Sequence, residues 1–147
     1  MLKYFKGSNL LDLGNYDSRV PLMAKEKHPQ SIVDIIDWIP DIIPFKDESY
    51  DYVVMGQLIE HLEEPQKTIK EAFRVLKPKG MLALSTSLEE KGIGEVDDKF
   101  HVWSFSQEDI KNLLELYCDD LEIDILRSQH FPYKYHFPHI VAFGRKK

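Results

Sequence analysis

The chain of 147 residues carries a formal charge of −6 and a single cysteine. Its length suits one domain, 1–147, that buries its own core, and its net negative charge argues against non-specific binding to nucleic acid or to an acidic membrane surface. One cysteine excludes an internal disulfide framework, and no apolar run approaches the roughly 18 residues that span a bilayer. We therefore expect a soluble, cytoplasmic protein whose partner is a small molecule or a basic protein.

The chain opens with an apolar strand, expected at 9–13, that closes on Gly14. Nucleotide-binding βα units begin this way, because glycine lets the chain turn sharply and lets a ligand approach the backbone. A short helix should follow, since Asp17 or Ser18 can cap its start. The β-branched stretch 31–38 is then expected to form the next strand.

Residues 43–87 indicate one strand, helix, strand unit. A β-branched and aromatic run predicts a strand at 50–55. From Pro65 the period changes to that of a helix, because apolar residues recur at i, i+3, i+4 and i+7 as Ile69, Ala72, Phe73 and Leu76. Lysine, proline and glycine at 77–80 should stop this helix, and the mostly apolar stretch 81–86 is typical of a buried parallel strand.

The C-terminal part begins with a polar stretch, 88–100, that predicts a long loop. Ser106 and Asp109 form a capping-box signature. The apolar spacing that follows predicts a helix, and Cys118 is expected to lie in this helical pattern. Two strands are expected after it, at 121–127 and 139–144. The ring-rich segment between them, 130–138, is interpreted as an active-site lid or a homodimer contact, and we favour neither a metal site on its histidines nor covalent catalysis by the cysteine.

Several short motifs of the central unit occur in a fixed order. An acidic turn at 47–51 leads into the strand, Glu60-His61-Leu62 follows the strand, and Arg74-Val75-Leu76-Lys77-Pro78 ends the helix. This combination resembles the class I S-adenosylmethionine-dependent methyltransferases, especially the small-molecule group known as methyltransferase type 11. The segment 100–106 also resembles the family's stretch before its next helix.

The resemblance implies a Rossmann-like α/β sheet, mostly parallel with a C-terminal antiparallel strand, and S-adenosylmethionine as a cofactor lying across the carboxyl ends of the first strands. Asp12 and Gly14 match the start of the family's glycine motif and would face the methionine part of the cofactor. Asp37 with Trp38 resembles the position that accepts a hydrogen bond from the adenine amino group. The residues beside the sulfonium would be Met55, Gly56 and Gln57.

The chain departs from the family pattern in two places. The family has Gly-x-Gly-x-Gly after its first strand, whereas here Gly14 is followed by residues 15–18 without a further glycine. Only about 37 residues separate Gly14 from Asp51, so we expect a sheet shortened by about one βα unit. We expect the missing unit to be the second. In the family, the strand of that unit normally ends on the acid that holds the ribose hydroxyls. Asp34 is the candidate replacement for that acid.

Two functions follow from these features. The first is methyl transfer from S-adenosylmethionine to a small acceptor, which Asp37 and the intact central unit favour. The second is a methyltransferase-like binding or regulatory protein without cofactor or catalysis, which the missing glycines favour. For a proton-bearing acceptor, His61 and His101 are the candidate bases, since histidine titrates near neutral pH. Each histidine also has an ordinary interpretation, as a helix-start residue and an exposed loop residue, and Glu60 is interpreted as an anchor for a loop.

Overall fold

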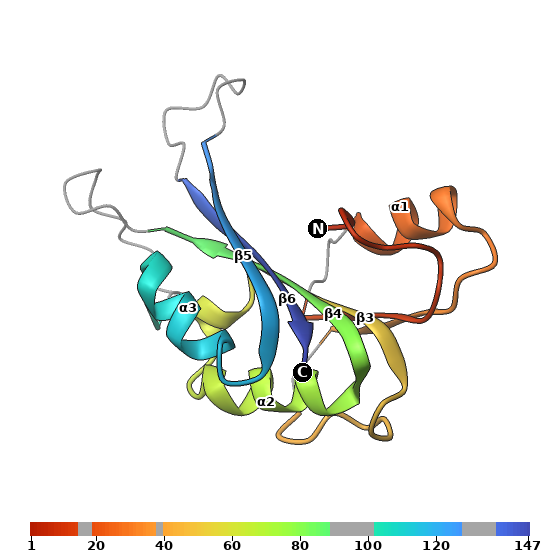
Figure 1. The fold of residues 1–147 in the computed structure, drawn as a ribbon, viewed down its shortest axis with the longest axis horizontal. Helices are drawn as coiled ribbons and strands as arrows, with labels where there is room; N and C mark the ends of the chain where they lie inside the picture. Colours follow the sequence, from red (N-terminus) through yellow and green to blue (C-terminus); the bar gives the residue numbers. More distant parts are fainter. Residues whose placement is uncertain (15–18, 38–39, 89–101, 128–137) are drawn as a thin grey trace.

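The computed structural model describes residues 1–14, 19–37, 40–88, 102–127 and 138–147 (Figure 1). Their strands are β1 (Leu10–Leu13), β2 (Val33–Ile36), β3 (Tyr50–Gly56), β4 (Leu76–Ser87), β5 (Cys118–Leu126) and β6 (His139–Lys146). The α-helices are α1 (Val20–Lys27), α2 (Pro65–Val75) and α3 (Gln107–Leu114), and a 3-10 turn, η1 (Ile59–His61), lies between β3 and α2. No helix in the described ranges is long and apolar enough to cross a bilayer.

The strands form one sheet in the order β2-β1-β3-β4-β6-β5. β1 pairs in parallel with β2 and β3, and β3 pairs in parallel with β4. β6 runs antiparallel to both of its neighbours, β4 and β5. The expected Rossmann-like α/β sheet, mostly parallel with a C-terminal antiparallel strand, is confirmed.

The shortening of the sheet falls at a different place from the one we expected. β2 lies directly beside β1 and is the outermost strand on that side. The strand beside β1 is therefore present, and the expectation that the second unit is missing was wrong. Counting residues between Gly14 and Asp51 shows that one unit is absent, but only strand pairing shows which one.

Two apolar cores lie on the two faces of the sheet. The larger core joins α2 and α3 to alternate strand residues such as Leu11, Val53 and Leu82. The smaller core joins the N-terminal segment and α1, through Phe5 and Ala24, to the opposite face. Figure 1 shows α2 and α3 together against the sheet and α1 apart from them. The nearly continuous burial of β1 and β3 requires this two-sided packing, because successive side chains of a strand point to opposite faces.

Arg74 attaches the segment before β3 to α2. Its guanidinium donates to the carbonyl oxygens of Ile43 and Phe45 at 2.8 and 2.9 Å, and to the carboxylates of Glu71 and Asp47 at 2.8 and 2.7 Å. The hydrogen bonds with Glu71 are the largest cause of the raised pKa of Arg74, and burial opposes it only in part. The central unit of the sequence is thus closed by charge-assisted hydrogen bonds as well as by apolar packing.

Cys118 is the first residue of β5 and not the end of a helix. The capping box is confirmed, since the Ser106 hydroxyl accepts from the Asp109 N–H at 3.2 Å and Asp109 accepts from the Ser106 N–H at 2.8 Å. The helix nevertheless ends at Leu114, because pairing with Lys146 of β6 draws the chain into the sheet from Cys118 onwards. Burial raises the pKa of the Cys118 thiol to about 11.

Candidate functional site

The carboxyl ends of four adjacent strands form one edge of the sheet, which we call the carboxyl edge. Gly14 follows β1, Asp37 follows β2, and Gly56 is the last residue of β3. Gly56 is paired with Ser85 of β4. The chain passes from β1 to β2 on one side and then to β3 on the other, so the order of strands reverses around β1. In open α/β sheets, ligands bind at such a reversal, outside the carboxyl ends of the strands.

Gly14 makes the turn at the end of β1. Its φ is +74°, in the left-handed region that favours glycine, and its N–H donates to the carbonyl oxygen of Ile36 at 2.6 Å. A Cβ at this position would lie 2.3 Å from Cδ1 of Leu58. Glycine is therefore required here by the backbone conformation and by close packing of the β1 turn against the residues that follow β3.

Gln57 joins the ends of β3 and β4. Its φ of 50° is unusual for a residue with a side chain, and its N–H donates to the Ser85 carbonyl oxygen at 2.8 Å. The side-chain amide donates to the Ser85 hydroxyl at 3.4 Å and accepts from the Ser87 hydroxyl at 3.1 Å. Local backbone strain of this kind concentrates at functional sites, where the surrounding hydrogen bonds hold it.

Glu60 connects the carboxyl edge to the segment before α3. The side chain is 1% exposed, and its Oε2 accepts from the Thr86 hydroxyl at 2.9 Å. Its backbone oxygen accepts from the N–H groups of Val102 and Trp103 at 2.8 and 3.2 Å. The Trp103 indole also donates to the Leu62 carbonyl oxygen at 2.8 Å. Within the described residues, Glu60 thus has the anchoring contacts that the sequence interpretation expected.

Two predicted cofactor residues are fully buried. Asp12 lies in β1 and alternates with Leu11 and Leu13, which face α2 and α3, so its carboxylate belongs to the opposite face. Met55 lies in β3, packed in the larger core between its partners Leu13 and Leu84. Asp34 lies in the middle of β2 and accepts from the Tyr50 hydroxyl at 2.7 Å, away from the carboxyl edge. Burial, followed by the hydrogen bond with Asp34, raises the pKa of Tyr50.

The other predicted residues differ in accessibility. Asp37 is exposed directly after β2, and His61 is exposed as the last residue of η1. Trp38, His101 and the segment 15–18 lie outside the described residues, as does 130–137 of the segment interpreted as a lid or dimer contact. The structure thus brings Gly14, Asp37, Gly56 and Gln57 to one edge and leaves the roles of both histidines as predictions.

The pairing of Glu60 with Thr86 was not predicted. A signal was present, because Ser85, Thr86 and Ser87 are three consecutive hydroxyl residues where an otherwise apolar strand ends. A polar run at that place is typical of the ligand edge of a parallel sheet. Sequence alone cannot tell which hydroxyl meets Glu60, because that depends on the register of β4 against η1.

Comparison with known proteins agrees with this architecture. A family model described as a methyltransferase domain matches residues 15–84, just under half of the chain. Phosphoethanolamine N-methyltransferase 2 of Caenorhabditis elegans is 32% identical over 76 residues, which are 51% of this chain and 17% of that protein. The ubiquinone/menaquinone biosynthesis C-methyltransferase UbiE of a Ruegeria species is 33% identical over 61 residues, which are 40% of this chain and 24% of that protein. The matched stretches thus span about a quarter or less of these relatives.

The similarity in structure extends over nearly the whole chain. The crystal structure of a methyltransferase-like protein from Bacillus halodurans superposes with a TM-score of 0.72 at 16% identity, covering 96% of this chain and 94% of that one. An identity this low shows the fold alone. Together with the match to the methyltransferase-domain model, this fold agrees with the resemblance to class I S-adenosylmethionine-dependent methyltransferases.

Proposed function

We propose that this chain, which has the class I methyltransferase fold, transfers a methyl group from S-adenosylmethionine to a small-molecule acceptor. The observation that carries the proposal is the placement of Gly14 and Asp37 at the ends of adjacent strands, beside the reversal in strand order. Dinucleotide-binding sheets place their glycine turn and an acidic residue, roughly twenty residues later, in this arrangement.

The exposed carboxylate of Asp37 fits a ribose. The resemblance in sequence suggested that Asp37 accepts from the adenine amino group. β2 lies directly beside β1, however, and in such sheets the acid that ends this strand accepts from the ribose hydroxyls. We therefore assign Asp37 to the ribose hydroxyls, a role for which Asp34 is unsuited because it is bonded to Tyr50 within the sheet.

The protein's part in this reaction is mainly positioning. Bound S-adenosylmethionine supplies an activated methyl group, so correct placement of the acceptor contributes much of the acceleration. Gln57 and Glu60 would keep the ends of β3, β4 and the Trp103 segment in a fixed relation around the site. If the acceptor must lose a proton, His61 is the candidate base among the residues that the structure describes. It is exposed at the end of η1, shortly after Gln57 in the chain.

Titration calorimetry with S-adenosylmethionine and S-adenosylhomocysteine tests the proposal. We expect micromolar dissociation constants and a roughly 10- to 100-fold weakening in Asp37→Ala, the effect of losing hydrogen bonds to a charged group. Asp41→Ala is the matched control, because Asp41 is an exposed acid shortly after Asp37 and should change binding less than twofold. Wild-type protein that releases no heat at millimolar ligand would overturn the proposal.

A specific observation favours a second candidate, a binding or regulatory protein that does not use the cofactor. Leu58 occupies the space over Gly14, so packing alone accounts for this glycine. Calorimetry separates the two functions, because only the enzyme requires cofactor binding that depends on Asp37. If the cofactor binds, release of S-adenosylhomocysteine with a panel of acceptors should follow, and phosphoethanolamine and a quinol, the acceptor types suggested by the relatives' names, belong in the first panel.

A further inference from the structure

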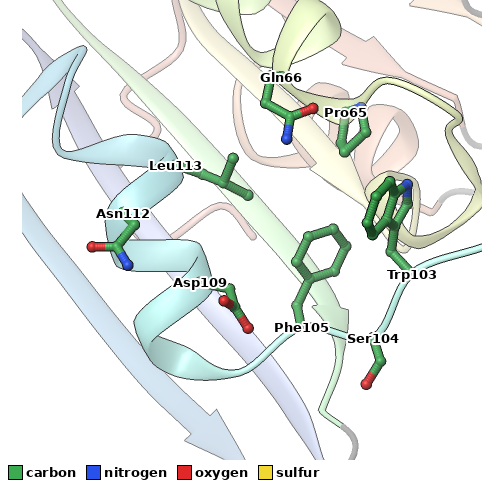
Figure 2. Close-up of a pocket in the computed structure, with 8 residues that line it drawn as sticks. All are labelled: Pro65, Gln66, Trp103, Ser104, Phe105, Asp109, Asn112 and Leu113. Atoms are coloured by element: carbon green, nitrogen blue, oxygen red, sulfur yellow. The ribbon is translucent and has the colours of Figure 1, made fainter.

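A pocket of about 370 Å³ lies between the beginning of α2 and one side of α3. Figure 2 shows Pro65 and Gln66 of α2 on one side and Asp109 and Leu113 of α3 on the other, with the Phe105 ring between them and the Trp103 ring beside Pro65. Its size and its mixture of aromatic, aliphatic and a few polar side chains are those of a small-molecule site. None of the carboxyl-edge residues Gly14, Asp37, Gly56 and Gln57 lines it.

The aromatic wall of the pocket is held in one orientation. The indole N–H of Trp103 donates to the Leu62 carbonyl oxygen, and its main-chain N–H donates to Glu60. The side chain of Trp103 is nevertheless 44% exposed. Phe105 is buried beneath it and pairs with Leu88 through an isolated β-bridge. The indole and the buried ring beside it offer an apolar surface to a ligand. Because the indole is already held in place, little side-chain conformational entropy is lost when a ligand packs on it.

Asp109 supplies a fixed negative charge. Its Oδ2 accepts from both the N–H and the hydroxyl of Ser106, at 2.8 and 2.6 Å, whereas its Oδ1 has no hydrogen bond with a described residue. The hydrogen bonds from Ser106 lower the pKa of the Asp109 carboxyl, so it is ionised at neutral pH. One oxygen of an oriented carboxylate is therefore available to a donor on a ligand.

The same surroundings disfavour an anion. Among the described residues that line the pocket, none is lysine, arginine or histidine. The capping box of α3 pairs the N–H of Asp109 with the Ser106 hydroxyl, and Pro65 at the start of α2 has no N–H to donate. Each helix thus offers fewer free N–H groups at its N-terminus, and the carboxylate of Asp109 repels a phosphate or a carboxylate that approaches the pocket.

We propose that this pocket binds a small organic amine, with its ammonium group at Asp109 and its apolar body against Trp103, Phe105 and Leu113. The site is distinct from the carboxyl edge, and the proposal stands whether or not the chain transfers methyl groups. The expected affinity for a minimal ligand is weak, with a dissociation constant on the order of 1 to 10 mM, as for other ligands of about ten heavy atoms.

Nuclear magnetic resonance titration of the full chain tests the site with three probes that differ mainly in charge: 2-phenylethylamine, 2-phenylethanol and phenylacetate. The chain has two tryptophans, so the indole signal of Trp103 reports the pocket and that of Trp38 is an internal control. We expect the amine to bind best and phenylacetate worst, with shifts at Trp103. Equal binding of amine and phenylacetate, or shifts confined to Trp38, would overturn the proposal.

Two variants change the charge of the pocket in opposite directions. Asp109→Asn should weaken amine binding about two- to fivefold without affecting the alcohol, while Glu108→Gln, which alters a neighbouring acid that does not line the pocket, should leave both unchanged. Gln66→Glu should strengthen amine binding by a similar factor, a gain that misfolding cannot produce. Unchanged amine affinity in both pocket variants would contradict the assignment, as would displacement of the amine by S-adenosylmethionine, because the pocket would then belong to the cofactor site.

Discussion

The Thr86→Val substitution removes the hydroxyl that donates a hydrogen bond to the buried carboxylate of Glu60, and it keeps the shape of the side chain. Thr86 is fully buried in β4, and its hydroxyl donates to Glu60 Oε2 at 2.9 Å. The other carboxylate oxygen, Oε1, has no hydrogen-bond partner among the described residues. Valine is also a good strand former, so the substitution should preserve the pairing of β4 and leave the carboxylate without its side-chain donor.

The expected loss in free energy of unfolding is about 2 to 3 kcal/mol, the usual contribution of a hydrogen bond to a charged group that becomes unsatisfied when buried. In a chain of this size a loss of 2 kcal/mol lowers the melting temperature by about 4 to 8 °C. Urea unfolding followed by circular dichroism at neutral pH measures the first quantity, and a thermal scan measures the second. The slope of the urea transition should not change, because the native surface is the same.

Thr68→Val is the matched control. Thr68 is buried on α2 and its hydroxyl has no hydrogen bond with a described residue, so this variant should lose less than about 1 kcal/mol. In a Glu60→Gln background, Thr86→Val should cost only about 1 kcal/mol, since the acceptor is then neutral. Equal losses for the two threonine variants, or a cost of Thr86→Val that Glu60→Gln does not reduce, would refute the reasoning.

Three further outcomes are expected. Gly14→Val should lower the free energy of unfolding in urea by about 1 to 3 kcal/mol, because it combines a left-handed φ with a clash against Leu58. The thiol of Cys118 should react slowly with a disulfide reagent in native protein and rapidly in urea. Folding raises the pKa of this thiol from 9.0 to about 11, so the native state favours the protonated thiol. The stabilisation from this pKa shift is therefore full below pH 9 and is lost as the pH rises towards 11. The Cys118→Ala variant should lack this pH dependence. Ser106→Ala should cost about 1 kcal/mol in urea at pH 7. Hydrogen bonds from Ser106 lower the pKa of Asp109 below 3.8. The stabilisation that these hydrogen bonds give is therefore present above pH 3.8 and is lost as the pH falls further and Asp109 becomes protonated.

Much of the central unit was predictable because its signals are local. The β-branched run of β3, the proline that begins α2 and the apolar spacing along α2 all act over a few residues, and each agrees with the structure. The capping box of Ser106 and Asp109 is equally local and is present as expected. Boundaries were less predictable: β2 is confined to Val33–Ile36, and β4 begins at Leu76, which the sequence pattern had placed at the end of the helix.

The candidate site was only partly predictable for a different reason. Gly14, Asp37, Gly56 and Gln57 could be named because the family resemblance assigns such positions to the cofactor. Each lies at or shortly after the end of an expected strand, and parallel strands bring such positions to one edge. The pocket beside Trp103 could not, since its walls come from α2, α3 and the segment between β4 and α3. Their proximity depends on how two helices pack on one face of the sheet.

The sequence by itself determined the α/β class, the central strand, helix, strand unit and the family resemblance, because periodicity, capping and turn chemistry operate between near neighbours in the chain. Only the tertiary structure decided that β2 lies beside β1, that Cys118 begins a strand, and that Glu60 meets Thr86. These features depend on backbone pairing and burial between residues far apart in sequence. Their free energies are gained only when the whole sheet has assembled.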